Sequence, residues 1–262
     1  MSISLKGKTI LITGASSGIG AATAKACVKH EMRCVISARR EDRLKQIADE
    51  LGELCIPVAG DVTESGFNKQ LLNEAKDIYA VFANAGHGLD QQIIDCELDS
   101  CRQFRELFEL NLFAAVELAS LCANRMLKNQ SGHILFCASC LSKFATPQHG
   151  AYCASKSALE AVAKSMRMEL KTSGIYVSSV HPIGTTTEFF DSSAHRSGKT
   201  ESKFKKRLPS WTMQSPENVA KAVVKCLRKP RQEVWTSYSM REISRLFAMF
   251  PSFSQRIIQR LD

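Results

Sequence analysis

The sequence has no stretch of eighteen or more consecutive apolar residues, so its pattern excludes a helix that crosses a membrane. Residues 1–8 include two serines and two lysines, and the apolar run that begins at Thr9 is too short for a secretory signal. The zinc-ligand spacings and the RNA-binding signatures of nucleic-acid-binding modules are also missing. These absences predict a cytoplasmic protein with no nucleic-acid partner and no metal site.

The composition is that of one folded domain: 262 residues, of which 44% are hydrophobic and 23% are charged. We see neither an internal repeat nor a linker, and we expect a single domain over residues 1–262. Lysine and arginine outnumber the acids by 35 to 26, which gives a net charge of +9. This excess favours anionic partners such as a phosphorylated cofactor, an acidic substrate or a lipid surface.

Short apolar runs alternate with longer amphipathic segments along most of the chain. The alternation predicts an α/β fold with a doubly wound, Rossmann-type parallel sheet, because parallel strands need crossover helices that cover both faces. Residues 186–215 are polar, break the alternation and are predicted to form a substrate lid. Strands are expected at 9–12, 34–37, 54–58, 78–83, 134–138, 175–180 and 233–236, and helices at 19–29, 43–51, 67–75, 101–127, 152–170 and from Pro216.

A glycine-rich turn follows the first expected strand. Its glycines let the backbone turn tightly and approach a pyrophosphate, and the next helix offers unpaired N–H groups and the positive end of its dipole. The spacing is Gly-x-x-x-Gly-x-Gly, which differs from the commoner Gly-x-Gly-x-x-Gly fingerprint. We expect a dinucleotide to be bound here by Gly14, Ser16, Ser17, Gly18, Ile19 and Gly20.

The end of the second expected strand indicates which dinucleotide is bound. NAD-binding proteins usually place an acid there for the free 2′-hydroxyl, whereas an arginine accommodates a 2′-phosphate. Arg39 and Arg40 come before the first acid, Glu41. Because a guanidinium makes paired, charge-assisted contacts with phosphate oxygens, we predict NADP(H) rather than NAD(H). The alternative is that both arginines are solvated residues at the start of a helix.

Five elements follow one another in the order and spacing of a known family: Thr13–Gly20, Ala83–Gly86, Asn111, Ser139 and Tyr152–Lys156. Together they resemble the short-chain dehydrogenase/reductase family, and the resemblance extends over nearly all of the chain up to about residue 187. It implies an oxidoreductase that interconverts a small-molecule carbonyl compound and an alcohol. It also implies a homo-oligomer, either a dimer or a tetramer.

The chemistry of the catalytic set follows from the residue types. Tyr152 and Lys156 are four apart on an expected helix and therefore share one face. A tyrosine titrates at about 10, and a neighbouring ammonium lowers that pKa, so Tyr152 can act as general acid or base. Ser139 lies at the carboxyl end of its strand, where its hydroxyl can bind the substrate oxygen. By resemblance, Asn111 holds a water in a proton relay and Lys156 also binds the nicotinamide ribose.

The resemblance implies further cofactor contacts on the adenosine side. The Asp61 carboxylate is expected to meet the adenine amino group, and Val62 to pack on the ring. Asn84, Ala85 and Gly86 are expected to form the floor under the adenosine ribose and to steady the sheet.

One loop departs from the family pattern. The family usually has Pro-Gly after the sixth strand, and here Pro182 is followed by Ile183. A β-branched residue resists positive φ, so we expect the loop to run differently, with Gly184 taking the turn. Pro182, Ile183 and Thr187 are the expected nicotinamide contacts.

Several signals leave alternatives open. Phe189, Phe190 and Trp211 fit a lipophilic ketone, whereas the basic segment 203–207 fits a carrier-bound ketoacyl group. Residues 240–262 form an amphipathic tail that Pro251 should break in two; we expect core or subunit packing, with contact to a membrane surface as the alternative. A non-catalytic NADP(H)-binding regulatory protein is the rival class, and the complete catalytic set argues against it.

The cysteines and histidines near the motifs are expected to have packing and lining roles rather than redox or metal-binding ones. Cys137 and Cys140 have the spacing of a redox or zinc pair, but without a second pair we expect plain packing. Because these two and Cys153 flank the catalytic residues, thiol modification is expected to inhibit. The histidines that adjoin the motifs are expected to be pocket walls rather than metal ligands: His87, His149 and His181.

Overall fold

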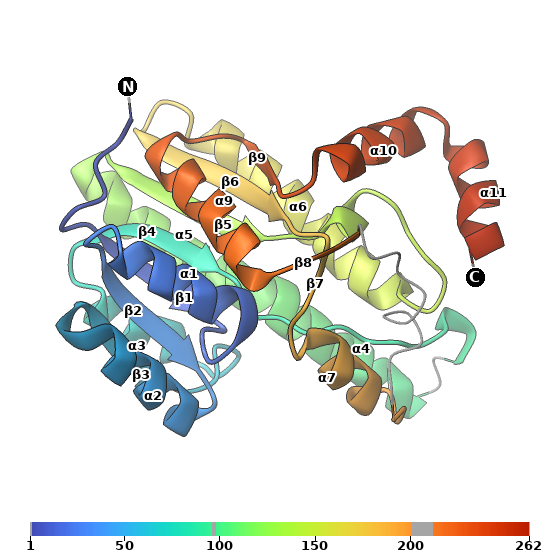
Figure 1. Ribbon diagram of the computed structural model, residues 1–262, viewed down its shortest axis with the longest axis horizontal. Helices are drawn as coiled ribbons and strands as arrows, with labels where there is room; N and C mark the ends of the chain where they lie inside the picture. The colour runs from blue at the N-terminus through green and yellow to red at the C-terminus, as the bar shows by residue number, and fades with distance from the viewer. Residues whose placement is uncertain (1, 96–97, 201–211, 262) are drawn as a thin grey trace.

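The computed structural model describes residues 2–95, 98–200 and 212–261, and a parallel sheet of seven strands runs through its centre (Figure 1). The strand order is β3-β2-β1-β4-β5-β6-β9, so the chain winds outward from β1 to β3, crosses over, and winds the other way from β4. This is the doubly wound α/β fold that the sequence predicts. The strands are β1 (Thr9–Thr13), β2 (Arg33–Ala38), β3 (Cys55–Ala59), β4 (Ile78–Ala83), β5 (Gly132–Cys137), β6 (Ile175–His181) and β9 (Glu233–Trp235).

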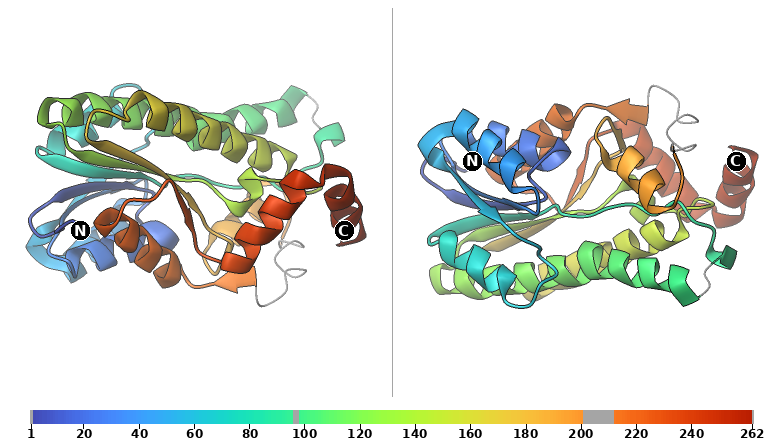
Figure 2. Two further views of the ribbon diagram at one scale, coloured as in Figure 1. Left: turned by 90° about the horizontal axis from the view of Figure 1, so that it is seen from above. Right: turned by 90° about the horizontal axis from the view of Figure 1, so that it is seen from below.

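Helices cover both faces of the sheet, as the edge-on views in Figure 2 show. Successive residues of a strand point to opposite faces, so Ile10 and Ile12 of β1 pack in one apolar cluster and Leu11 in the other. On the first face lie α1 (Gly18–Val28), α2 (Glu41–Leu51) and α9 (Pro216–Arg228); on the second lie α3 (Phe67–Glu74), α4 (Leu98–Phe108), α5 (Ala114–Asn129) and α6 (Gly150–Glu169).

The prediction of a single helix at 101–127 is wrong in one respect. The structure divides it into α4, a π-helical turn at Glu109–Phe113, and α5. Asn111 lies in this turn and is fully buried, and its amide bonds to the backbone of His87 in the loop after β4. A π-helical turn inside an α-helix often accompanies a functional position, and a hydrophobic repeat does not reveal it.

Two segments extend from the sheet at the carboxyl ends of its strands (Figure 1). Within the expected lid, α7 (Phe189–Arg196) follows β7 (Gly184–Thr185), which pairs with β8 (Met213–Gln214); Trp211 and residues 203–207 lie outside the described residues. The tail consists of α10 (Tyr238–Met249) and α11 (Pro251–Leu261), with Pro251 at the start of the second helix. Among the described residues, no helix is both long and apolar enough to cross a membrane.

Candidate active site

A cavity of about 980 Å³ opens at the carboxyl ends of the strands and extends from the glycine-rich turn to the tail helices. It brings together almost all of the site residues that the sequence predicts. Gly20 and Asn111 do not line it, for reasons given below. The predicted residues that do line it are Gly14, Ser16, Ser17, Gly18, Ile19, Arg39, Arg40, Asp61, Val62, Asn84, Ala85, Gly86, Ser139, Tyr152, Lys156, Pro182, Ile183 and Thr187.

The glycines of the turn are required by close packing. A Cβ added to Gly20 would lie 2.4 Å from the carbonyl oxygen of Gly14, so Gly20 supports the turn from behind instead of lining the cavity. Gly14 has a φ of +65°, and a Cβ there would lie 2.9 Å from the Cα of Ala85. Gly18 begins α1, and its backbone faces the cavity with the unpaired N–H groups of a helix start.

Asn84 joins the glycine turn to the end of β4. Its Nδ2 donates to the carbonyl oxygen of Thr13 over 2.9 Å. In return, the Thr13 hydroxyl accepts the N–H groups of Asn84 and Ala85, both at 3.0 Å. These bonds fix the two neighbouring strand ends against each other, which agrees with the expected role of Asn84 in steadying the sheet.

Arg40 is held in a network that reaches the lid. Its Nε donates to Ser16 Oγ over 3.1 Å and one Nη donates to Ser17 Oγ over 2.7 Å. Its other Nη pairs with Glu188 at 2.7 Å, and Arg43 pairs with the same carboxylate. The guanidinium therefore lies against the serines of the glycine-rich turn and is partly neutralised by Glu188.

Arg39 lies in a more open position beside Asp61. Its side chain is 62% exposed, and its nearest acid, Asp61, is 3.6 Å away. Burial raises the pKa of Asp61, but hydrogen bonds from Thr63 and the charge of Arg39 outweigh burial and lower it overall. Asp61 is therefore a carboxylate, as its expected contact with an amino group needs.

Arg196, in the last turn of α7, is a cavity residue that the sequence analysis missed. Burial lowers the pKa of Arg196, and the charge of Arg39 lowers it further. Two guanidiniums thus approach the same part of the groove from distant parts of the chain. The basic last turn of a helix in the expected lid was the only available signal, and it does not distinguish an exposed arginine from one that enters the site.

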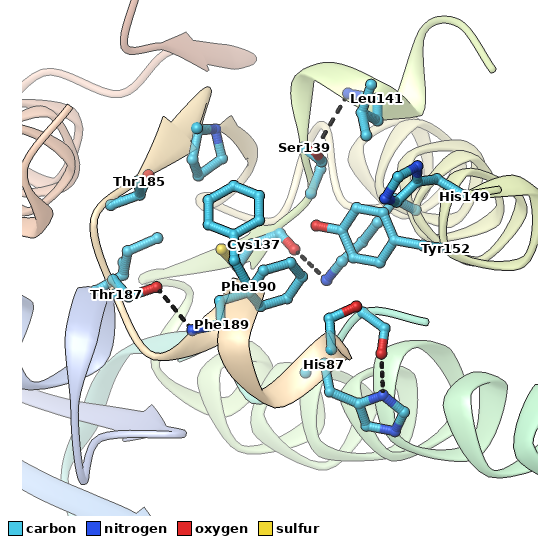
Figure 3. Close-up of a pocket in the computed structure, with 18 of the residues that line it drawn as sticks. His87, Cys137, Ser139, Leu141, His149, Tyr152, Thr185, Thr187, Phe189 and Phe190 are labelled. Atoms are coloured by element: carbon cyan, nitrogen blue, oxygen red, sulfur yellow. Dashed lines mark hydrogen bonds between the residues drawn. The ribbon is translucent and has the colours of Figure 1, made fainter. Parts of the chain in front are cut away.

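Tyr152 and Ser139 point toward one another in the cavity (Figure 3), and Lys156 lines the same cavity. Tyr152 and Lys156 are both buried on α6, and Lys156 Nζ lies 5.8 Å from the centre of the Tyr152 ring. The ammonium donates to the carbonyl oxygen of Cys137 over 2.8 Å. Ser139 Oγ accepts the N–H of Leu141 over 3.1 Å, which leaves its hydroxyl proton free to be donated.

The pKa of the phenol differs from the expectation. Burial raises the pKa of Tyr152, and a hydrogen bond with Ser139 lowers it only in part. Burial also lowers the pKa of Lys156. The prediction that the lysine lowers the pKa of Tyr152 considered only charge, whereas removal of the phenol from water disfavours its anion more strongly. The isolated chain therefore holds Tyr152 as a neutral phenol.

Asn111 lies behind the cavity wall, next to Lys156. A Cβ added to Gly86 would lie 2.8 Å from Asn111 Oδ1 and 3.4 Å from Lys156 Nζ, so the two groups flank that glycine. The amide is occupied, since it accepts from the N–H of His87 and donates to the His87 carbonyl and to Ser155 Oγ. This position explains why Asn111 is missing from the lining; its role in a water relay stays a prediction.

The loop after β6 runs without the expected turn. Neither Ile183 nor Gly184 has a positive φ, and Gly184 enters strand β7, so the expectation that Gly184 takes the turn is wrong. The Pro182 carbonyl accepts the N–H of Cys140 over 3.0 Å, and Ile183 is buried. An extended loop accommodates a β-branched residue, which is why isoleucine fits here.

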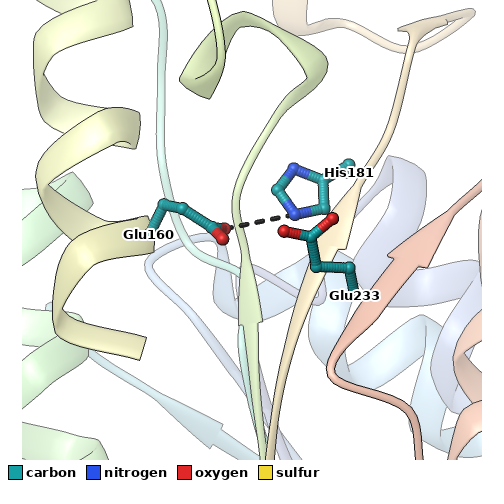
Figure 4. Close-up of side chains that lie close together, drawn as sticks. All are labelled: Glu160, His181 and Glu233. Atoms are coloured by element: carbon teal, nitrogen blue, oxygen red, sulfur yellow. Dashed lines mark ion pairs between the residues drawn. The ribbon is translucent and has the colours of Figure 1, made fainter. Parts of the chain in front are cut away.

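His181 is not a pocket wall, which corrects the expectation. It is fully buried at the end of β6, where its ring stacks on Trp235 at 4.6 Å between centroids. Nδ1 lies 3.0 Å from the Ser139 carbonyl oxygen and Nε2 lies 3.1 Å from Glu160 (Figure 4). His181 thereby connects the catalytic strand end to buried charges.

Glu160, His181 and Glu233 could in principle offer three metal-ligand atoms, all within 4.8 Å of one another. The Lys143 ammonium, however, contacts Glu160 at 3.1 Å and Glu233 at 2.7 Å. A cation of the protein already stands between the carboxylates, so this cluster is an ion-pair network.

The thiols around the site are protected by burial. Cys137, Cys140 and Cys153 are all buried, and burial raises the pKa of each, for Cys140 to about 11. Since the thiolate is the reactive form, the structure disfavours the expected inhibition by thiol modification. Packing as small apolar side chains is the role that their environment supports.

The doubly wound sheet and a cavity at its carboxyl edge are those of an α/β oxidoreductase. The family model described as short chain dehydrogenase matches residues 8–197, and the chain belongs to this family. Short chain aldehyde dehydrogenase 1 of Euphorbia lathyris is 35% identical over 191 residues, which is 70% of this chain and 65% of that protein. The chain thus spans slightly less than two thirds of this relative. A 3-oxoacyl-[acyl-carrier-protein] reductase of Rickettsia bellii is 28% identical over 84% of this chain and 89% of its own.

Solved structures show the same fold. A short-chain dehydrogenase/reductase of Burkholderia phymatum in complex with NAD has a TM-score of 0.82 at 20% identity and covers 96% of each chain. A short-chain dehydrogenase of Sphingobium yanoikuyae in complex with NADPH has a TM-score of 0.78 at 24% identity, over 95% of each chain. Because both cofactors occur among these neighbours, they leave the choice between NAD(H) and NADP(H) open for this chain.

Proposed function

We propose that this chain is an NADP(H)-dependent oxidoreductase that interconverts a ketone or an aldehyde with an alcohol, with Tyr152 as general acid and base. The observation that carries the proposal is the meeting of Tyr152, Lys156 and Ser139 in the same cavity as the glycine turn. The residues fit a dinucleotide, because Gly14 and Gly18 keep the turn free of side chains where a helix starts. When bound, the nicotinamide supplies or accepts the hydride.

The remaining chemistry is proton transfer by the chain's own groups. In the direction of reduction, the substrate oxygen gains one proton, and the neutral phenol of Tyr152 is placed to donate it. The Ser139 hydroxyl donates a hydrogen bond to the same oxygen, since its Oγ is already fixed by Leu141. The Lys156 ammonium, 5.8 Å from the ring centre, then stabilises the phenolate that remains.

The direct test replaces Tyr152 by phenylalanine, which removes one oxygen and little packing. We expect turnover of NADPH with a panel of ketones and aldehydes to fall by about 10²–10⁴-fold, the usual contribution of a general acid. NADPH binding, measured by fluorescence titration, should persist. Tyr176→Phe is the matched control, because Tyr176 is half exposed on β6 and away from the cavity.

Two outcomes count against the proposal. Turnover of Tyr152→Phe within a few-fold of the parent chain excludes Tyr152 as the acid. Tight NADPH binding by the parent chain without turnover of any substrate supports the rival class, a regulatory protein that binds the dinucleotide.

The preference for NADP(H) rests on the arginines at the end of β2 and on Arg196. Arg39 and Arg196 both line the cavity, and the charge of Arg39 lowers the pKa of Arg196; a 2′-phosphate between the two guanidiniums relieves that repulsion. Arg40 adds a guanidinium over Ser16 and Ser17. Asp61 is the acid nearest to Arg39, and its carboxylate already accepts hydrogen bonds from Thr63.

The preference is tested by replacing Arg39 and Arg196 by alanine, separately. Each change should lower the ratio of kcat/KM for NADPH to that for NADH by about 10- to 100-fold, since a charge-assisted contact contributes about 1.5–3 kcal/mol. Lys45→Ala is the control, because Lys45 lies on the exposed face of α2 and pairs with Glu41. An unchanged ratio in both arginine variants contradicts the choice of NADP(H).

Apolar side chains at the far end of the cavity support a lipophilic substrate. Phe144, Phe189, Phe190 and Phe247 line it there, and the Phe189 ring meets the Tyr152 ring at 5.4 Å. Such a wall favours apolar groups next to the reacting carbonyl. A carrier-bound ketoacyl group is the second candidate, and the similarity to 3-oxoacyl-[acyl-carrier-protein] reductases favours it.

A further inference from the structure

The tail helices α10 and α11 form part of the cavity wall. Met240, Ile243 and Phe247 of α10 line the cavity, together with Ile257 and Ile258 of α11. The Phe247 ring meets the ring of Phe144, a cavity residue outside the tail, edge to face at 5.4 Å. One face of the tail therefore lines the cavity in which the substrate is proposed to bind.

The same two helices also carry exposed apolar side chains, two of which lie outside the cavity lining. Met249 is 65% exposed and Phe250 is 55% exposed, at the junction of the helices, and neither lines the cavity. Leu246 and Phe253 are 40% and 52% exposed, yet both also line the cavity. Leu246, Met249, Phe250 and Phe253 are near one another in sequence at the junction of the helices, so exposed apolar side chains occur both at the cavity wall and outside it. A cluster of exposed apolar side chains of this kind marks an interaction site.

A further apolar element lies at the same end of the molecule. Ile93 and Ile94, which follow β4 in a short helical turn, are 55% and 86% exposed. In Figures 1 and 2 this turn and α11 both project beyond the carboxyl ends of the strands. These two isoleucines and the exposed apolar residues of the tail therefore lie at the same end of the molecule.

Positive charge predominates on these two helices. Residues 238–261 contain four arginines and a single acid, Glu242. Glu242 pairs with Arg245 at 3.2 Å and lies 3.6 Å from Arg241. Arg256, three residues after Phe253 on α11, is exposed. Exposed aromatic and aliphatic side chains interspersed with arginines are the composition that binds an anionic lipid surface.

We propose that the outer face of α10 and α11, formed by Leu246, Met249, Phe250 and Phe253 with Arg245 and Arg256, docks on an anionic lipid bilayer. The apolar side chains enter the interface while the arginines meet lipid phosphates, and the open end of the cavity faces the membrane. An apolar substrate then reaches Tyr152 without crossing water. A symmetric contact with a second copy is less favourable, because it brings the same arginines together.

The test is sedimentation of the full chain with vesicles. The parent chain should bind vesicles of phosphatidylcholine with about one third phosphatidylserine, and should bind pure phosphatidylcholine vesicles at least about tenfold more weakly, because the arginines need anionic headgroups. Met249→Ser with Phe250→Ser should lower binding to the anionic vesicles by about tenfold or more. Neither residue lines the cavity, so NADPH oxidation with a small aldehyde should remain unchanged.

Met168→Ser is the matched control, since Met168 is 71% exposed on α6 and belongs to neither surface. Binding by the double variant equal to that of the parent chain overturns the proposal, as does equal binding of the parent chain to neutral and anionic vesicles. Dissociation of a dimer by the double variant, without any vesicle binding by the parent chain, assigns the face to a second copy instead. Because aldehyde turnover is measured separately, a failed proposal here leaves the proposed activity untouched.

Discussion

Glu160 is a buried carboxylate that contacts two side chains next to the active site, Lys143 and His181. Burial raises the pKa of Glu160, but the contact with His181 and the charge of Lys143 outweigh burial and lower it to about 2. His181 in turn lies against the carbonyl oxygen of Ser139. One carboxylate thus holds both the Lys143 ammonium and the His181 ring and, through His181, the strand end that carries the serine hydroxyl.

This arrangement predicts how stability depends on pH. A lowered pKa in the folded state contributes stability above pH 4.5, the ordinary value, and that contribution is lost as the pH falls from 4.5 toward about 2. Glu160→Gln should lower the free energy of unfolding by about 3 kcal/mol at pH 7, because the contribution of the lowered Glu160 pKa is lost and the Lys143 ammonium keeps only Glu233 as a partner. The difference from the parent chain should shrink at pH 3, as measured by urea unfolding.

Glu31→Gln supplies the control for that experiment. Glu31 pairs with Lys6 at the surface, where both side chains are more than half exposed, so its loss should cost at most about 1 kcal/mol. If Glu160→Gln unfolds at the same urea concentration as Glu31→Gln, the buried network does not stabilise the chain.

At the scale of elements, α7 is attached to the body of the protein at both ends. Just before the helix begins, Glu188 pairs with Arg40 and Arg43 next to the glycine-rich turn. At its other end, Ser193 donates to the Asp90 carboxylate over 2.7 Å, and the same oxygen lies 3.1 Å from His149 Nε2. The helix that carries Phe189 and Arg196 is thereby placed over the cavity.

Removal of the second attachment should loosen the helix without altering the chemistry. Asp90→Ala leaves Ser193 and His149 without this buried acceptor, so we expect faster amide hydrogen exchange in residues 189–196. KM for the carbonyl substrate should rise several-fold while kcat changes little, because Tyr152 keeps its place on α6. Exchange in α1 serves as the internal reference. A fall in kcat with an unchanged KM is the contrary result.

At the scale of the whole molecule, the site exists because the sheet is doubly wound. The chain leaves β3 at one edge and returns to β4 beside β1, and this crossover opens a crevice at the carboxyl ends of the strands. Residues from the glycine turn, the loop after β4, the end of β5, α6 and the lid line that crevice, together with residues of the tail helices. Assembly into a dimer or a tetramer and a cytoplasmic location stay predictions.

Local features of the chain determined much of this picture. The apolar runs of β1 and β4 are buried on both faces, and such strands are recognisable because nearly every residue is apolar. The separation of Tyr152 and Lys156 by one helical turn is likewise a property of sequence spacing. The glycines of the turn are recognisable from their spacing after a strand, and Gly14 and Gly18 have a positive φ; their close packing against Ala85 and Thr187 is decided by the tertiary structure.

Only the tertiary structure decided which distant groups meet and how deeply they are buried. Arg196 approaches Arg39, and Glu160 meets His181 and Lys143, because separate crossovers bring their elements to one edge of the sheet. The raised pKa of Tyr152 is also a tertiary effect, since it comes from burial by residues far along the chain. Spacing along a sequence fixes the direction of a side chain, whereas its desolvation and its charged neighbours depend on the packed molecule.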